Sequence, residues 1–230
     1  MTLKATLAAT ALVVFGAPFA TAQTQGVSKT EILVGSILNL SGPVAAYGKQ
    51  TRAGMQLRAD EINEQGGVNG RKIRLPVEDN AYDPKRSVLA GEKLVNQDKI
   101  VAMLGHLGSA HNNATMPVQF DKNVVNFFPL SSAREMYEPV HKLKGSMFVS
   151  YYDQIRLPLP KLIKDNNVKK VCVHYQDNHL GLEVLKGGEA ALKVLNMDLH
   201  RKNAGICAMP RGWNHQPEGE PPPAQQERRL

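Results

Sequence analysis

Two short segments of this 230-residue chain carry residue types that could hold a small anion. Gly105–Ser109 and Phe128–Ser132 each follow an apolar, strand-like run, and each ends in a serine where a helix should begin. In an α/β sheet, ligands bind at the carboxyl ends of the strands, where helix N-termini offer free N–H groups and a partial positive charge. Ser109 and Ser132 therefore predict a cradle for a small carboxylate, which is a binding function rather than a bond-breaking one.

The same serines also have simpler structural interpretations, which the residues alone leave open. Ser132–Glu135 has the pattern of a helix capping box, and Ser109 could equally be an ordinary helix cap. A nucleophilic serine of the hydrolase type needs the pattern G-x-S-x-G, whereas Leu107–His111 spells L-G-S-A-H. The chain is therefore not expected to be an enzyme.

The histidines do not form a recognisable metal site. His106 and His111 are five residues apart, as are His174 and His179, and this spacing does not place two side chains on one helical face. No aspartate, glutamate or cysteine completes a zinc set beside them. We expect no metal ion and no other cofactor.

The bulk composition excludes further classes of function. The chain carries 28 lysines and arginines against 21 acidic residues, a net charge of +7, but the basic residues form no long run. A nucleic-acid-binding surface clusters its basic residues, so no nucleic-acid partner is expected. The two cysteines, Cys172 and Cys207, form no redox or zinc motif, and Cys172 lies in an apolar run that predicts burial.

The N-terminus has the three parts of an export signal. Lys4 supplies the charge, residues 5–17 form an apolar segment, and Ala20-Thr21-Ala22 fits the small-x-small cleavage rule. The apolar segment is too short to span a bilayer. We expect cleavage near Ala22, an exported chain that starts near Gln23, and a periplasmic location.

Strand and helix patterns alternate along the rest of the chain, which predicts an α/β fold with a parallel sheet flanked by helices. Pro76 predicts an edge or bulge in its strand, and Pro117 predicts a bend or break in its helix. Strands are expected at 31–38, 72–78, 100–104, 124–128, 147–150 and 168–173, and helices at 48–65, 83–97, from 109, at 153–164 and at 180–195.

The alternating pattern stops at about His200. Residues 201–230 contain five of the fourteen prolines and no apolar periodicity, and Pro221–Gln226 is typical of disordered or polyproline II segments. This composition predicts a disordered or foreign tail rather than the end of a folded domain.

Four blocks in this order and spacing resemble type I periplasmic binding proteins of the leucine/isoleucine/valine-binding class. The blocks are Ser41–Gly48, Glu61–Gly70, Asp79–Pro84 and Gly105–Ser109, and the resemblance covers 29–199. It implies two Rossmann-like lobes that trap a small ligand, an amino acid of the branched-chain type or a related carboxylate or amide. It also implies a monomeric receptor that serves the membrane permease of an ABC importer.

The resemblance implies the two lobes, and the composition of the two ends completes the division of the chain. Residues 1–22 are the signal peptide, 23–146 the first lobe, 147–200 part of a second lobe, and 201–230 the tail. Two complete lobes need roughly 250 to 350 residues, so the second lobe is expected to be incomplete. A non-functional truncated fragment and an exported ligand-sensing domain of the same fold are the alternatives.

The resemblance also implies roles for single residues. Ser109 would hold the ligand carboxylate with its hydroxyl and N–H, and Ser132 would contribute a second hydroxyl. The carbonyl of Leu130 would accept a hydrogen bond from the ligand ammonium, and Tyr47 would line the first lobe. Leu180 stands where the branched-chain binders place a tyrosine.

The chain departs from the family at one covalent feature. The positions of the family's disulfide are occupied by Tyr82 and Gly108, so both cysteines are absent together. Neither this change nor Leu180 is expected to break the fold, but Leu180 weakens the case for leucine as the ligand.

Overall fold

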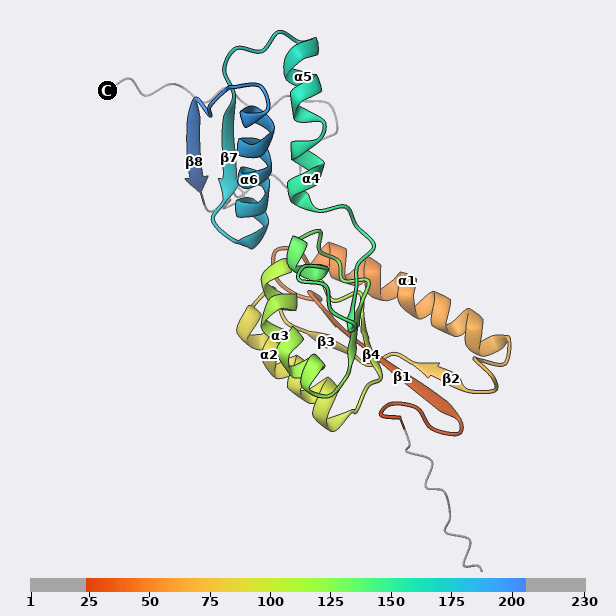
Figure 1. The fold of residues 1–230 in the computed structure, drawn as a ribbon. Helices are drawn as coiled ribbons and strands as arrows, with labels where there is room; N and C mark the ends of the chain where they lie inside the picture. The colour runs from red at the N-terminus through yellow and green to blue at the C-terminus, as the bar shows by residue number, and fades with distance from the viewer. Residues whose placement is uncertain (1–23, 206–230) are drawn as a thin grey trace, which may run out of the picture.

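The computed structural model describes residues 24–205, so the predicted signal peptide and most of the predicted tail lie outside the described residues. These residues form two α/β lobes, one above the other in Figure 1, and residues 146–150 run from one to the other. The strands are β1 Glu31–Leu38, β2 Lys72–Arg74, β3 Val77–Asp79, β4 Ala102–Leu104, β5 Val125–Phe127, β6 Lys144–Gly145, β7 Cys172–Gln176 and β8 Arg201–Gly205. The helices are α1 Ala45–Glu64, α2 Pro84–Glu92, η1 Lys93–Gln97, α3 Ser109–Asp121, η2 Arg134–Met136, α4 Tyr151–Arg156, α5 Leu159–Asp165 and α6 His179–Lys193.

The first lobe is built on a parallel sheet with the strand order β2-β1-β4-β5-β6, and β3 also pairs with β1. Successive side chains of a strand point to opposite faces, so β1 serves both sides. Ile37 packs into the core cluster on the α2 side, and Val34 lines a hollow under α1. Figure 1 shows α2 and α3 side by side over the sheet, away from α1.

The main core lies between this sheet and α2 with η1. Its largest members are completely buried, and burying each such side chain contributes about 1.5–3 kcal/mol. The cluster consists of Ile37, Ala90, Leu94, Val95, Ile100, Met103 and Val124.

The second lobe contains the parallel pair β7-β8 and three helices. Glycine allows α6 to pack closely on α4, because a methyl group at Gly187 would lie 2.4 Å from the carbonyl oxygen of Tyr152. Cys172, the first residue of β7, is exposed, so the prediction of a buried cysteine was wrong.

Several predicted boundaries were wrong for local reasons. Pro76 separates β2 from β3, which pair with different halves of β1, so the expected edge strand is two short strands. The helix that contains Pro117 is α-helical throughout from Ser109 to Asp121, so Pro117 does not break it. Pro158 divides the helix expected at 153–164 into α4 and α5.

Two strands lie elsewhere than the sequence predicted. Residues 147–150 form no strand, and the sheet ends instead with β6. The strand expected at 168–173 is β7, displaced toward the C-terminus, and it pairs with β8 just beyond His200. The alternating pattern therefore continues through Gly205, past the predicted start of the tail.

Candidate functional site

The two serine-containing segments lie side by side at the carboxyl edge of the first-lobe sheet. The N–H of Leu130 donates to the carbonyl of His106 at 3.0 Å, and the N–H of Gly108 donates to the carbonyl of Leu130 at 3.2 Å. These bonds extend the pairing of β4 with β5 beyond the strands. The Leu130 carbonyl, predicted to accept from a ligand, thus already accepts one bond and keeps one lone pair.

Helix α3 begins at this edge with unpaired donors. Ser109, Ala110 and His111 are the first three residues of the helix. The backbone N–H groups of a first turn have no acceptor within the helix. The cap residue, Gly108, provides no side chain to satisfy them. An anion at this end would accept hydrogen bonds from several N–H groups and would be attracted by the positive end of the helix dipole.

A short chain of hydroxyls supports the same helix end. The Ser109 Oγ lies 2.8 Å from the Ser131 Oγ, and the Ser131 Oγ accepts from the N–H of Ala133 at 3.2 Å. Ser131 can therefore donate its proton to Ser109, which leaves the Ser109 proton free for a ligand. Bonds in such a chain polarise one another.

Gly108, His111 and Tyr82 fit together as one unit beside this helix end. Gly108 has φ +98°, and a methyl group on it would lie 2.3 Å from the His111 Nδ1. The ring of Tyr82 lies against that of His111, with the centroids 4.6 Å apart. Gly108 and Tyr82 thus accommodate the buried imidazole of His111 between them.

Both histidines near the site are held neutral. Burial, with a smaller contribution from His111, lowers the pKa of His106 to about 3. Burial also lowers the pKa of His111, although the Tyr82 carbonyl and Asp83 oppose this. The His106 Nδ1 lies 3.2 Å from the Thr115 hydroxyl, which ties the segment before α3 to the body of that helix.

A polar loop holds the start of α1, which carries Tyr47. Asp79 accepts from the N–H of Leu40 at 2.8 Å and from the Ser41 hydroxyl at 2.6 Å. Burial raises the pKa of Asp79, but these donors outweigh burial and the net pKa is lowered. A methyl group at Gly48 would lie 2.1 Å from the Asn39 carbonyl oxygen, so only glycine allows this packing of α1 on the end of β1.

The second lobe contributes the start of α6. The Asn178 side chain caps this helix by accepting from the N–H of Gly181 at 3.1 Å. The next two residues, His179 and Leu180, face the first lobe and line the same cavity as Ser109. In Figure 1 the beginning of α6 lies at the end of the second lobe nearest the first.

These parts enclose a cavity of about 490 Å³ between the lobes. The structure brings four of the five predicted site residues to its wall: Tyr47, Ser109, Leu130 and Leu180. Their roles toward a ligand remain predictions. The other lining residues are Val44, Tyr82, Pro84, Leu107, Gly108, Ala110, His111, Tyr151, Asn178 and His179.

Ser132 is the exception among the predicted site residues. No α-helix begins there; a single 3-10 turn follows at η2, and its cap residue is Ala133. Ser132 is buried outside the cavity wall, and its carbonyl accepts from the N–H of Tyr151 at 2.8 Å. Its neighbour Ser131 bonds to Ser109 instead, so the capping-box interpretation was also wrong.

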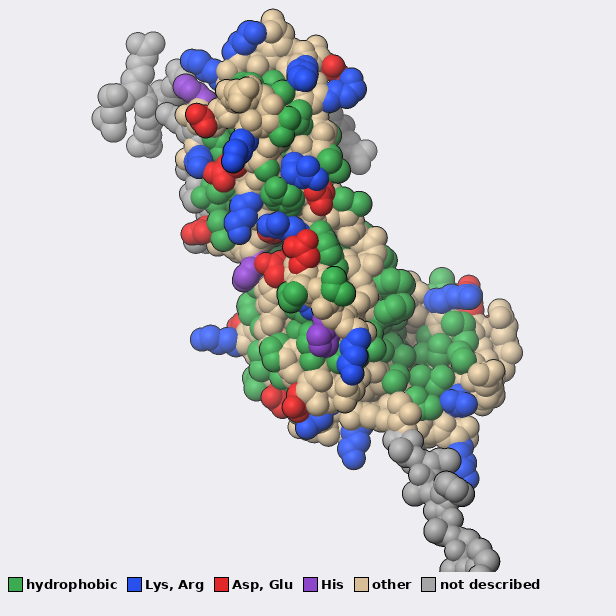
Figure 2. Space-filling view, in the orientation of Figure 1, with side chains coloured by type: hydrophobic (Ala, Val, Ile, Leu, Met, Phe, Trp, Pro, Cys, Tyr) green, Lys and Arg blue, Asp and Glu red, His purple; other side chains and the backbone are tan. Residues whose placement is uncertain are grey.

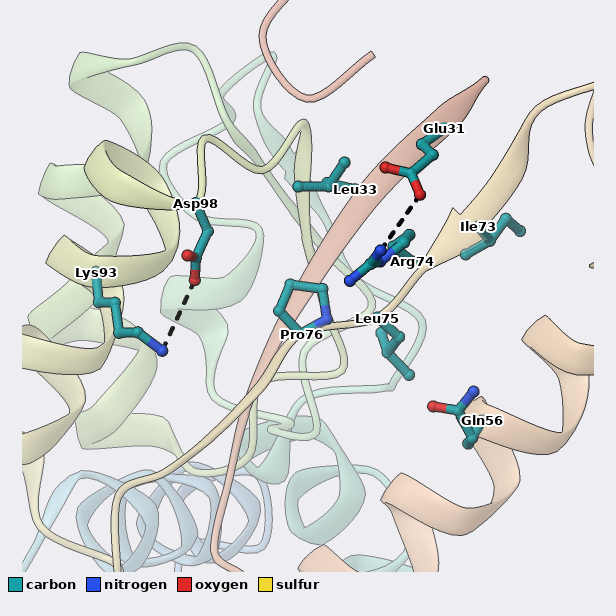
Figure 3. Close-up of a pocket in the computed structure, with 9 residues that line it drawn as sticks. All are labelled: Glu31, Leu33, Gln56, Ile73, Arg74, Leu75, Pro76, Lys93 and Asp98. Carbon is teal, nitrogen blue, oxygen red and sulfur yellow. Dashed lines mark hydrogen bonds and ion pairs between the residues drawn. The ribbon is translucent and has the colours of Figure 1, made fainter. Parts of the chain in front are cut away.

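A larger hollow of about 670 Å³ lies elsewhere on the first lobe (Figure 3). It lies along the amino-terminal half of β1, beside β2, and away from the carboxyl ends of the strands. Its charged side chains pair with one another: Arg74 with Glu31 at 3.3 Å, and Lys93 with Asp98 at 3.9 Å. These pairs leave no unpaired charge that would select a ligand.

Two features are absent from residues 24–205. No helix there is long and apolar enough to cross a membrane. No group of three histidine, cysteine, aspartate or glutamate side chains in that range could hold a metal ion.

A family model described as periplasmic binding protein matches residues 31–202, which is most of the chain and both lobes. The chain belongs to the periplasmic binding protein family. The match includes β1, with which the first lobe begins, and extends into β8 of the second.

Individual relatives agree with this assignment. A leucine-, isoleucine-, valine-, threonine- and alanine-binding protein of Pseudomonas aeruginosa is 35% identical over 104 residues, 45% of this chain and 28% of that protein. Leu/Ile/Val-binding protein homolog 7 of Brucella suis is 28% identical over 191 residues, 77% of this chain and 47% of that protein. This periplasmic binding protein thus spans half or less of the length of these relatives.

A solved structure shows the same fold. A substrate-binding periplasmic protein from Ralstonia solanacearum superposes with a TM-score of 0.71 at 27% identity. The superposition covers 77% of this chain and 50% of that one. The α/β fold with parallel sheets flanked by helices is therefore that of the type I periplasmic binding proteins.

Proposed function

We propose that this periplasmic binding protein binds an amino acid, or a related small carboxylate or amide, between its two lobes. One observation carries the proposal: the unpaired N–H groups at the start of α3, with the Ser109 hydroxyl, border a 490 Å³ cavity that α6 closes from the second lobe. The ligand carboxylate is placed at these donors.

The chemistry of the wall supports a ligand of this kind. Among the described residues, the wall contains no lysine, arginine, aspartate or glutamate. Neutral donors can hold a carboxylate without a buried counter-ion, whose desolvation is costly. The Leu130 carbonyl offers its remaining lone pair to a ligand ammonium, and Val44 and Leu180 offer apolar surface to the ligand side chain.

The biological role proposed is that of the receptor of an ABC importer. The chain would be exported, lose residues 1–22, act as a monomer and present its ligand to a membrane permease. The P. aeruginosa relative, named for the amino acids it binds, supports an amino acid as the ligand. The proposed division places the first lobe at 23–146 and a partial second lobe after it.

Catalysis is not part of the proposal. A serine nucleophile needs a base within hydrogen-bonding reach. The hydrogen-bond partner of the Ser109 hydroxyl is the hydroxyl of Ser131 and not a histidine ring.

Isothermal titration of the full chain with single amino acids and their amides tests the proposal. We expect saturable binding that weakens about ten- to a hundredfold in Ser109→Ala, because the lost bond is one to a charged group. Thr51→Ala, a hydroxyl removed from α1 outside the cavity wall, is the matched control and should bind as the wild type does. Equal binding by wild type and Ser109→Ala would contradict the placement of the carboxylate.

A further inference from the structure

A bidentate ion pair crosses from one lobe to the other. Arg134 lies in η2 of the first lobe, and Glu183 lies in α6 of the second. The Arg134 Nε donates to the Glu183 Oε2 at 2.8 Å, and its Nη2 donates to Oε1 at 2.7 Å. Two parallel bonds of this kind fix orientation as well as distance.

The pair is partly shielded from water, and the ring of Tyr152 packs against its guanidinium. The Glu183 side chain is 5% exposed and that of Arg134 29% exposed. The guanidinium lies over the ring of Tyr152, 4.3 Å from its centroid, where cation–π attraction adds to the pairing. This shelter distinguishes the pair from surface ion pairs, which contribute little.

Both partners lie close to the cavity along the chain. Glu183 is three residues, or about one helical turn, beyond Leu180, and Arg134 is three residues beyond Ser131, the partner of Ser109. The pair therefore joins α6, whose first residues line the cavity, to the turn η2, which follows the segment that bonds to Ser109. Together with residues 146–150 it connects the lobes at a second point.

We propose that the Arg134–Glu183 pair is a positioning interaction of the ligand site: it holds the N-terminus of α6 facing the N-terminus of α3. The inference rests on the proposed function. A cavity that is already assembled spares the ligand the free energy of bringing the lobes together, so affinity depends on the pair although neither side chain lines the cavity.

The first arm of the test measures the lobes without ligand. Spin labels on Cys172 in the second lobe and on Lys122→Cys in the first, in a Cys207→Ser background, report the interlobe distance by pulsed electron resonance. We expect a narrow distribution in this labelled parent and a broad one after Glu183→Gln. Glu189→Gln, which breaks the exposed pair with Lys202 inside the second lobe, is the matched control and should stay narrow.

The second arm measures affinity for leucine and threonine by titration. Glu183→Gln should weaken binding about ten- to a hundredfold relative to Glu189→Gln, the range of a bond to a charged group. Arg134→Lys, which cannot form the bidentate bond, should weaken it as well. Circular dichroism of each variant checks that the fold is retained.

The outcomes separate the two proposals. A narrow distribution in Glu183→Gln, or a broad one with unchanged affinity, overturns the positioning role and leaves the proposed function intact. Failure of the wild type to bind either amino acid counts against the proposed function, and the positioning role falls with it. Broadening together with weaker binding supports both.

Discussion

Gly108 is the residue on which the shape of the cradle depends most closely. Its φ of +98° is a conformation that other residues rarely adopt, and the His111 ring occupies the space of a side chain. Gly108→Ala should lower the free energy of unfolding by about 1–3 kcal/mol, measured by urea denaturation. Gly54→Ala on α1, where a methyl group meets nothing within 4 Å, should instead raise it by about 0.5–1 kcal/mol through helix propensity. Equal stability of both variants would contradict this reading of the site.

His106 makes stability depend on pH in a definite direction. Its folded pKa of about 3 lies below its ordinary value of 6.5, so the unfolded chain binds more protons below pH 6.5. Stability should therefore fall with pH from 6.5 downward, by about 1.4 kcal/mol per pH unit for each such histidine. His111 acts in the same direction.

Urea unfolding at pH 7 and pH 5 checks this prediction. The wild type should lose about 2 kcal/mol or more between the two values. His106→Gln should lose clearly less, because it removes one of the two groups. A wild type whose unfolding midpoint is the same at both pH values would rule out a buried neutral histidine.

Single site residues could be predicted from the sequence where a local signal, such as a helix start, fixes their position. Ser109 was found because a serine after a strand and before a helix marks a helix start. Ser132 was misplaced because nothing local showed that only a single 3-10 turn follows β5. Tyr151 had no signal at all, since the chain brings it to the cavity only after crossing between the lobes.

Among the elements, α6 carries the second side of the site and depends on its packing against α4. Gly187→Ala would place a methyl group 2.4 Å from the Tyr152 carbonyl oxygen, and should destabilise the protein by about 1–3 kcal/mol. Gly188→Ala meets nothing within 4 Å and should stabilise it by about 0.5–1 kcal/mol through helix propensity. Thermal unfolding of the two variants compares them; a shift in the same direction for both would contradict the packing described.

Element boundaries were predictable only where a local signal sets them. The Asp83 side chain caps α2 as the pair Asp83-Pro84 predicts, by accepting from the N–H of Lys85 at 2.7 Å. By contrast, β7 begins where β8 is available to pair with it, and that partner lies beyond the apparent end of the alternating pattern. The pairing of two strands that are distant in sequence cannot be predicted from the sequence of either strand alone.

Over the whole molecule, hydrophobic side chains gather around α1 on the first lobe (Figure 2). Beneath that helix lies an apolar hollow of about 310 Å³, lined by residues that include Met55, Ile62 and Leu75. Apolar surface of this kind binds hydrophobic molecules. We expect enhanced fluorescence of an anilinonaphthalene sulfonate dye with the native chain.

A matched pair of variants on α1 locates the dye. Met55→Glu places a charge in the hollow and should lower the signal, whereas Leu57→Glu alters a residue that is 63% exposed and outside it. A dye signal that both variants leave unchanged would show that the hollow is not the binding surface.

The most direct measurement follows the backbone amide resonances of the full chain as leucine, threonine or another amino acid is added. A ligand carboxylate at the start of α3 should shift the N–H signals of Ser109, Ala110 and His111 most, with smaller shifts at His179 and Leu180 across the cavity. Ser109→Ala should diminish all of them. Saturable binding that leaves these five signals in place, or shifts instead the residues around Glu31 and Arg74, would contradict a ligand site between the lobes.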